Sequence, residues 1–98
     1  MKQGFVYMVS NKNRTTIYVG VTNNLERRIL EHKRGIGSAF TSKYNLTDLM
    51  YFEQIDGMLN AINREKQLKN WHKEWKWNLI RKDNPELKDL SEGWYKYE

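Results

Sequence analysis

Two short runs of strand-forming residues near the N-terminus constrain the fold of this 98-residue chain more than any other feature. Residues 5–9 read FVYMV and residues 16–21 read TIYVGV, with a polar segment between them. Aromatic and β-branched residues favour strands, so the pattern predicts a β-hairpin. A four-residue turn would place Tyr7 directly opposite Tyr18, with both phenol rings on one face of the sheet.

A helical pattern follows the hairpin directly. Asn23 or Asn24 can cap the helix, and Leu25, Ile29 and His32 then recur at spacings of four and three residues. The spacing predicts a helix with one apolar face, which carries His32.

The rest of the chain adds a strand and two helices. We expect residues 35–40 (GIGSAF) to form a loop, residues 46–55 a third strand, and residues 58–71 and 75–80 two helices. The predicted fold class is α/β of the α+β type: a small three-stranded antiparallel sheet flanked by helices, with residues 1–98 forming one domain.

Composition narrows the classes of partner. The chain has no cysteine, no apolar run long enough to span a membrane and no signal-peptide pattern, so we expect a cytoplasmic protein. Seventeen Lys and Arg against twelve Asp and Glu give a net charge of +5, which favours polyanions. Nucleic acid, above all DNA, is the expected partner and an acidic membrane surface the weaker alternative; no protein partner is implied.

Glu65 is the most unusual residue of the helix predicted over residues 58–71. It follows Ala61 and Ile62 by four and three residues, so it falls inside the apolar stripe. A buried carboxylate requires a cation, because leaving it unpaired would cost several kcal/mol. The cation could be a metal ion, or it could be Arg28 or a neighbouring basic residue in a purely structural ion pair.

The order of these residues resembles that of the GIY-YIG nuclease superfamily. The resemblance rests on Tyr7, then Tyr18-Val19-Gly20, then Arg28 and His32, then Glu65. It implies that Tyr7, Tyr18, Arg28, His32 and Glu65 are catalytic, and that Glu65 binds one Mg²⁺ or Mn²⁺ ion.

The chain departs from the family pattern at two positions. Phe5 stands where the first motif usually has glycine, and Val21 stands where some branches carry a lysine. His32 or Lys43 is then a candidate substitute for the missing cation.

The resemblance implies a role in phosphodiester hydrolysis for each of the matched groups. Tyr7, with Tyr18 as the second choice, would take a proton from the attacking water, which requires a pKa below the usual value near 10. Arg28 would neutralise the phosphoryl oxygens. Gly20, without a Cβ, would let a phosphate approach the sheet, and the adjacent Arg27 would contribute to binding.

A basic and aromatic segment, residues 66–82, supplies further contacts. Lys69 and Lys73 are expected to bind phosphates, whereas Trp71 and Trp75, four residues apart, are expected to close the core. The sequence thus predicts a metal-dependent endonuclease that hydrolyses DNA with weak sequence specificity. The alternatives are a nucleic-acid-binding module that does not cut, an interfacial membrane protein, and a structural protein in which Glu65 pairs with Arg28.

Overall fold

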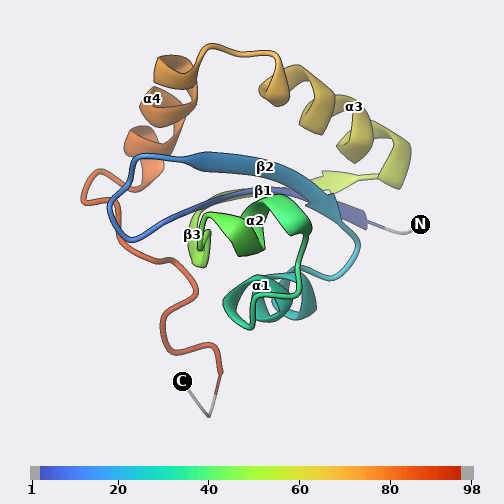
Figure 1. Ribbon diagram of the computed structural model, residues 1–98. Coiled ribbons are helices and arrows are strands. Elements are labelled where there is room, and N and C mark those ends of the chain that lie inside the picture. Colours follow the sequence, from blue (N-terminus) through green and yellow to red (C-terminus); the bar gives the residue numbers. More distant parts are fainter. Residues whose placement is uncertain (1–2, 96–98) are drawn as a thin grey trace.

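The computed structural model describes residues 3–95 and contains one antiparallel sheet between two layers of helices (Figure 1). The elements in order are β1 (Gln3–Ser10), β2 (Ile17–Thr22), α1 (Leu25–Lys33), α2 (Ala39–Lys43), β3 (Asp48–Asp56), α3 (Met58–Lys69) and α4 (Lys73–Asp83). The strand order is β2-β1-β3, so β1 is central and β2 forms an edge. The predicted fold class is confirmed.

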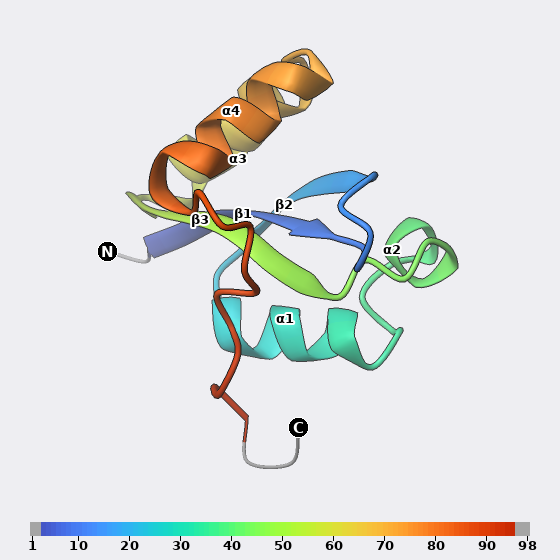
Figure 2. The same cartoon turned by 90° about the vertical axis from the view of Figure 1, so that its left-hand side faces the viewer.

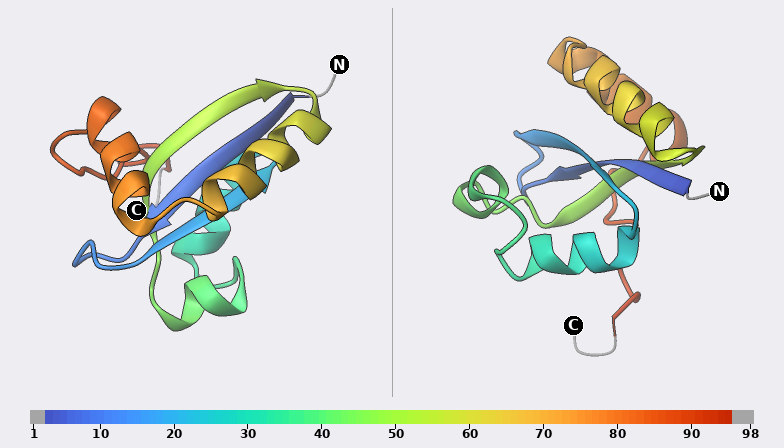
Figure 3. Two further views of the ribbon diagram at one scale, coloured as in Figure 1. Left: turned by 90° about the horizontal axis from the view of Figure 1, so that it is seen from above. Right: turned by 90° about the vertical axis from the view of Figure 1, so that its right-hand side faces the viewer.

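The helices are divided between the two faces of the sheet. α3 and α4 cover one face, and α1 and α2 lie on the other (Figures 1 and 2). Viewed from above, α3 follows the line of β1 and β2, and the polypeptide after α4 passes back to the opposite face (Figure 3). Each face therefore has its own apolar core, and the two cores share the sheet as their common wall.

Alternation along the strands assigns side chains to the two cores. The core under α3 and α4 contains Val6, Met8, Val19, Met50, Ala61, Leu68, Trp77 and Ile80, and the core over α1 contains Tyr7, Val9, Leu25, Ile29, Leu46 and Leu49. Trp71 packs against the first core, but Trp75 is exposed, so its predicted core position is wrong. Trp77, two residues on, fills that role.

The hairpin register differs from the predicted one. Tyr7 pairs with Gly20, and Tyr18 pairs with Val9, because six residues rather than four connect the strands. The Asn11 side chain explains the difference: its Oδ1 accepts hydrogen bonds from the backbone N–H groups of residues 15 and 16, which keeps those residues out of the ladder. Tyr7 and Tyr18 still share a face, since the shift is two residues.

Residues 35–40 are only partly a loop, because α2 begins at Ala39. The Ser38 hydroxyl accepts a hydrogen bond from the backbone N–H of Thr41, at 3.1 Å, and so caps the new helix. Among residues 3–95, no helix is long and apolar enough to span a membrane.

Candidate active site

The Tyr7 hydroxyl is the centre of a buried polar cluster on the α1 face. Tyr7 lies in the central strand, and its Oη is 2.8 Å from His32 Nε2 and accepts a hydrogen bond from Arg28 Nε at 3.3 Å. His32 and Arg28 are one turn apart on α1, so the helix presents both to the phenol. The structure thus brings these three side chains together.

Gly20 provides the space that the phenol occupies. A Cβ at Gly20 would lie 2.3 Å from both Cζ and Oη of Tyr7, far inside van der Waals contact. The packing of Tyr7 therefore requires a glycine at position 20, whether or not a phosphate binds there.

His32 is fully enclosed, and its two ring nitrogens have different partners. Nε2 meets Tyr7 Oη, and Nδ1 lies 3.0 Å from Thr41 Oγ1. Thr41 Oγ1 also donates to the Ser38 carbonyl, at 3.3 Å. These bonds are all satisfied when Nδ1 carries the proton and donates to Thr41, while the bare Nε2 accepts from Tyr7.

The α2 segment completes this cluster and was missed by sequence reasoning. Thr41 is buried, and a Cβ at Gly37 would lie 2.2 Å from His32 Nδ1, so the backbone at Gly37 closes over the imidazole. The Ser38 hydroxyl lies 2.9 Å from Thr41 Oγ1 and fixes its position. Ser38, three residues before Thr41, was the available sequence signal for the start of α2. A helix of one turn is too short to give a periodic pattern.

Electrostatics in the cluster favour neutral groups. Burial raises the pKa of Tyr7 to about 12, despite the nearby Arg28, and burial together with the Arg28 charge lowers the pKa of His32 to about 4. The direction for Tyr7 is opposite to the lowered pKa that a phenolate base would require. At neutral pH the pair is a phenol donating to an imidazole.

The two neighbouring arginines point to different surroundings. Arg28 Nη1 pairs with Glu31 at 3.0 Å while its Nε reaches Tyr7, whereas the Arg27 side chain is 62% exposed and reaches Glu31 only at 4.0 Å. Arg28, and not Arg27, therefore faces the Tyr7 hydroxyl.

Glu65 lies on the other face of the sheet, in α3. Its side chain is 13% exposed, and Oε2 is 2.8 Å from Lys69 Nζ. The same ammonium lies 5.4 Å from the ring centroid of Tyr18 in β2. Glu65 therefore does not pair with Arg28, and Lys69 connects it to the edge strand.

Tyr18 connects the two groups of candidate residues. Its ring centroid is 5.9 Å from that of His32 on one side, and Lys69 stands over the ring on the other. Because β2 is an edge strand, no further strand of the described part of the chain separates the α1 face from the α3 face at this point. Tyr7, Arg28 and His32 thus cluster beside Tyr18 on the α1 face, and Lys69 links Tyr18 to Glu65 on the other face.

The residues at this edge fit a hard divalent cation held by one carboxylate. No group of three or more His, Cys, Asp or Glu side chains that could hold a metal occurs among residues 3–95. Mg²⁺ is commonly held by one or two carboxylates, with waters and substrate phosphates completing its shell. Glu65 can supply the one carboxylate, and it already binds a positive charge, the Lys69 ammonium at 2.8 Å. A structural zinc site, which needs four protein ligands, would not fit here.

Other residues considered at the sequence level have local partners. Lys73 donates to the backbone carbonyl of Thr15, in the turn that precedes β2, and the Lys43 ammonium lies 5.3 Å from the centroid of the Tyr44 ring. Within residues 3–95, neither lysine makes a hydrogen bond to the Tyr7 hydroxyl.

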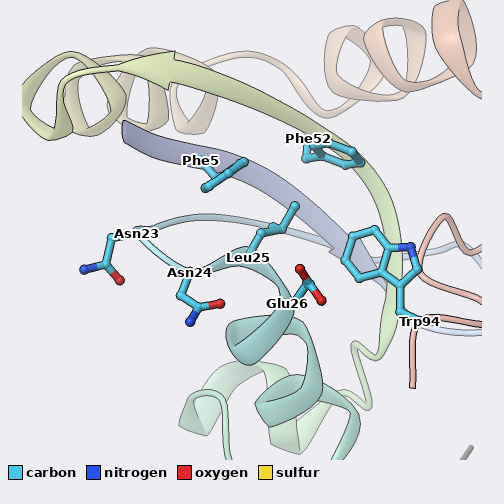
Figure 4. Close-up of a pocket in the computed structure, with 7 residues that line it drawn as sticks. All are labelled: Phe5, Asn23, Asn24, Leu25, Glu26, Phe52 and Trp94. Carbon is cyan, nitrogen blue, oxygen red and sulfur yellow. The ribbon is translucent and has the colours of Figure 1, made fainter. Parts of the chain in front are cut away.

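A separate pocket opens at the N-terminus of α1 (Figure 4). Its volume is about 560 Å³, and Phe5, Phe52 and Trp94 form its apolar wall. Within residues 3–95, Glu26 is the only charged residue that lines it. A pocket with a carboxylate and no cation does not suit a phosphate, which separates it from the cluster around Tyr7.

Comparison with known proteins gives one family. The profile of the GIY-YIG catalytic domain matches residues 3–78. A UPF0213 protein of Syntrophus aciditrophicus is 33% identical over 87 residues, covering 88% of this chain and 98% of the relative. A UPF0213 protein of Clostridium perfringens is 36% identical over 76 residues, covering 78% of this chain and 81% of the relative. No solved structure matches significantly.

Proposed function

This chain belongs to the GIY-YIG family, and from that premise we propose that it is a metal-dependent endonuclease that hydrolyses DNA phosphodiester bonds with weak sequence specificity. We extend the proposal to residues 1–98 as a single nuclease domain. The observation that carries it is the Tyr7 hydroxyl, which contacts His32 and Arg28 together at the edge where Tyr18 and Glu65 also lie.

The hydrogen bonds of Tyr7 support a proton relay rather than a free phenolate. As Tyr7 Oη takes a proton from the attacking water, its own proton passes to His32 Nε2, 2.8 Å away. The relay avoids ionising a phenol whose pKa is raised to about 12. Thr41 is a positioning residue in this scheme, because its bond to Nδ1 leaves Nε2 free to accept.

Substrate charge would assist the relay. The positive charge of Arg28 is one cause of the low pKa of His32, after burial itself. A phosphodiester bound to the Arg28 guanidinium offsets that charge and raises the proton affinity of His32 when substrate is in place. Arg28 also stabilises the negative charge that develops on the phosphoryl oxygens.

Glu65 would hold one Mg²⁺ or Mn²⁺ ion, in exchange for its present contact with Lys69. Such an ion, when bound, supplies Lewis-acid stabilisation of the phosphoryl group and the leaving oxygen. Lys69, once released, is an exposed cation beside Tyr18 and can contact a DNA phosphate. Lys73 and Arg27 would add phosphate contacts on either side.

The proposal is tested by nicking of supercoiled plasmid and of labelled linear DNA, with Mg²⁺, with Mn²⁺ and with EDTA. We expect cleavage only with metal, at many positions, and binding that falls steeply with salt. Tyr7→Phe purified in parallel controls for contaminating nuclease. Metal-dependent cleavage that is equal in both preparations, or DNA binding without any cleavage, would contradict the proposal; the second result would favour a non-cutting binding module.

A further inference from the structure

The short helix α2 carries an aromatic surface that continues directly from the candidate active site. The Tyr18 and Phe40 ring centroids are 6.1 Å apart, and those of Phe40 and Tyr44 are 4.9 Å apart. Phe40 is 46% exposed and Tyr44 44% exposed. We call these two rings and the Lys43 ammonium beside them the α2 platform. Figures 1 and 2 show α2, which carries it, on the α1 side of the sheet.

The fold holds the α2 platform in place although its rings are exposed. Thr41, between the two rings in sequence, is buried against His32, and the Ser38 cap starts the helix. The helix is therefore anchored by its inner side and presents Phe40 and Tyr44 outward. Rings fixed in this way lose little conformational freedom when a ligand stacks on them.

The charge around the α2 platform favours a polyanion. Residues 32–47 include Lys33, Arg34 and Lys43 but no Asp or Glu. Lys33 pairs with Asp89, whereas Arg34 and Lys43 have no carboxylate partner within residues 3–95. Exposed aromatic rings among unpaired cations are the combination by which proteins bind single-stranded nucleic acid, with rings under bases and cations on phosphates.

We propose that the α2 platform stacks an unpaired nucleobase of the substrate strand, next to Tyr18 at the candidate active site. The inference rests on the proposed function for the identity of the strand and adds the class of substrate: DNA that is single-stranded beside the bond to be cut. A base inside an intact duplex has both faces stacked already, so it cannot use these rings.

The test measures binding without cleavage, by fluorescence anisotropy of labelled oligonucleotides in EDTA. We expect Phe40→Ala and Tyr44→Ala each to weaken binding of a single strand by about fivefold or more, and binding of a duplex of equal length by less than about twofold. Phe40→Tyr keeps a ring and should bind like wild type, whereas Phe40→Leu keeps only apolar bulk and should resemble Phe40→Ala.

Two controls make the result specific. Leu59→Ala removes an apolar side chain that is 71% exposed on α3, and it should change neither affinity. Scanning a single abasic position along the strand should reveal one position at which wild type loses affinity but Phe40→Ala does not, since the ring and the base are then partners of one contact.

Three results would each overturn the proposed role of the α2 platform. They are equal losses of affinity for single strand and duplex, full affinity of Phe40→Leu, and the absence of any sensitive abasic position. Full affinity of Phe40→Ala for both DNAs would do so as well, and would point to a protein partner for these rings. Because cleavage is assayed separately with metal, a protein that binds as predicted but never cuts would contradict the proposed nuclease while leaving the α2 platform intact.

Discussion

The two faces of the sheet hold their polar groups in different ways. On the α1 face Tyr7, His32 and Thr41 are buried, neutral and joined by hydrogen bonds of 2.8 and 3.0 Å. On the α3 face Glu65 and Lys69 are charged, and the Lys69 side chain is 46% exposed. A buried network fixes the positions and tautomer of groups that transfer a proton, whereas a charged pair at the surface can exchange its partner for a metal ion or a phosphate.

The comparison teaches how a chain of this size can bring both kinds of group to one place. Each face keeps its own core, so the charges of Glu65 and Lys69 lie across the sheet from the neutral network. The two faces meet at the edge strand, where Tyr18 contacts His32 on one side and Lys69 on the other. If this division is correct, substitutions on the two faces should have different effects on metal dependence, pH dependence and stability.

Glu65→Gln should have the largest effect, because it removes the charge that a divalent ion requires while it keeps the side-chain volume. We expect the cleavage rate to fall by roughly 10³-fold or more, because the Lewis-acid stabilisation is lost. The free energy of unfolding should change by only about 0.5 kcal/mol, since Lys69 is 46% exposed and glutamine keeps an oxygen that can accept its hydrogen bond. Plasmid nicking, thermal melts and DNA binding check this, and a variant that still cuts with Mg²⁺ would show that the α3 face is not catalytic.

Tyr7→Phe should reduce the rate by about 10³-fold, since it deletes only the hydroxyl that joins water to His32. Tyr18→Phe should lose less, because the structure gives its hydroxyl no comparable pair of partners within residues 3–95. Single-turnover rates at saturating DNA measure the two losses. Near-normal rates in both variants would show that the hydrogen-bonded network on the α1 face serves packing and not catalysis.

Arg28→Ala should slow cleavage by about 10²-fold, through loss of a phosphoryl contact in the transition state. Arg27→Ala is the matched control on the same helix, and its exposed side chain predicts a weaker effect that appears as reduced affinity. The ratio of maximal rate to KM for each variant separates the two. The reverse pattern would mean that the guanidinium facing Tyr7 is not the one that contacts substrate.

The smallest expected effect is a pH dependence of stability that comes from the α1 face. The folded-state pKa of His32, about 4, lies below its ordinary value of 6.5, so the unfolded chain binds more protons between these values. Stability from this group is complete above pH 6.5 and is lost as pH falls toward 4, by about 2 kcal/mol between about pH 7.5 and about pH 5. Denaturant melts at the two pH values measure it. His32→Gln should remove that part of the slope, and an unchanged slope would contradict the buried, neutral imidazole.

Local patterns were sufficient to predict much of this molecule. The helix that carries Leu25, Ile29 and His32 follows from their spacing, and all three are buried as expected. The position of Glu65 inside an apolar stripe predicted a largely buried carboxylate with a cation partner, which Lys69 supplies. Both features depend on helical periodicity, which a sequence records directly.

Features that depend on competing or distant contacts were not predictable. The register of the hairpin is set by the Asn11 side chain, which competes with the ladder for backbone N–H groups. The raised pKa of Tyr7 comes from burial beneath elements that are remote in sequence. The contact of Thr41 with His32 requires α2 to fold back over the imidazole. A helix of one turn has no periodic pattern from which the sequence could predict it.

One measurement tests most directly whether the two faces form a single active site: a double-mutant cycle of single-turnover cleavage rates for wild type, Tyr7→Phe, Glu65→Gln and the double variant. Residues that serve the same reaction step as a unit show strongly non-additive losses. We predict that the double variant cleaves about as slowly as the slower single variant, far above the product of the two losses. Losses that multiply, or a single variant that retains the wild-type rate, would contradict a shared site at the β2 edge.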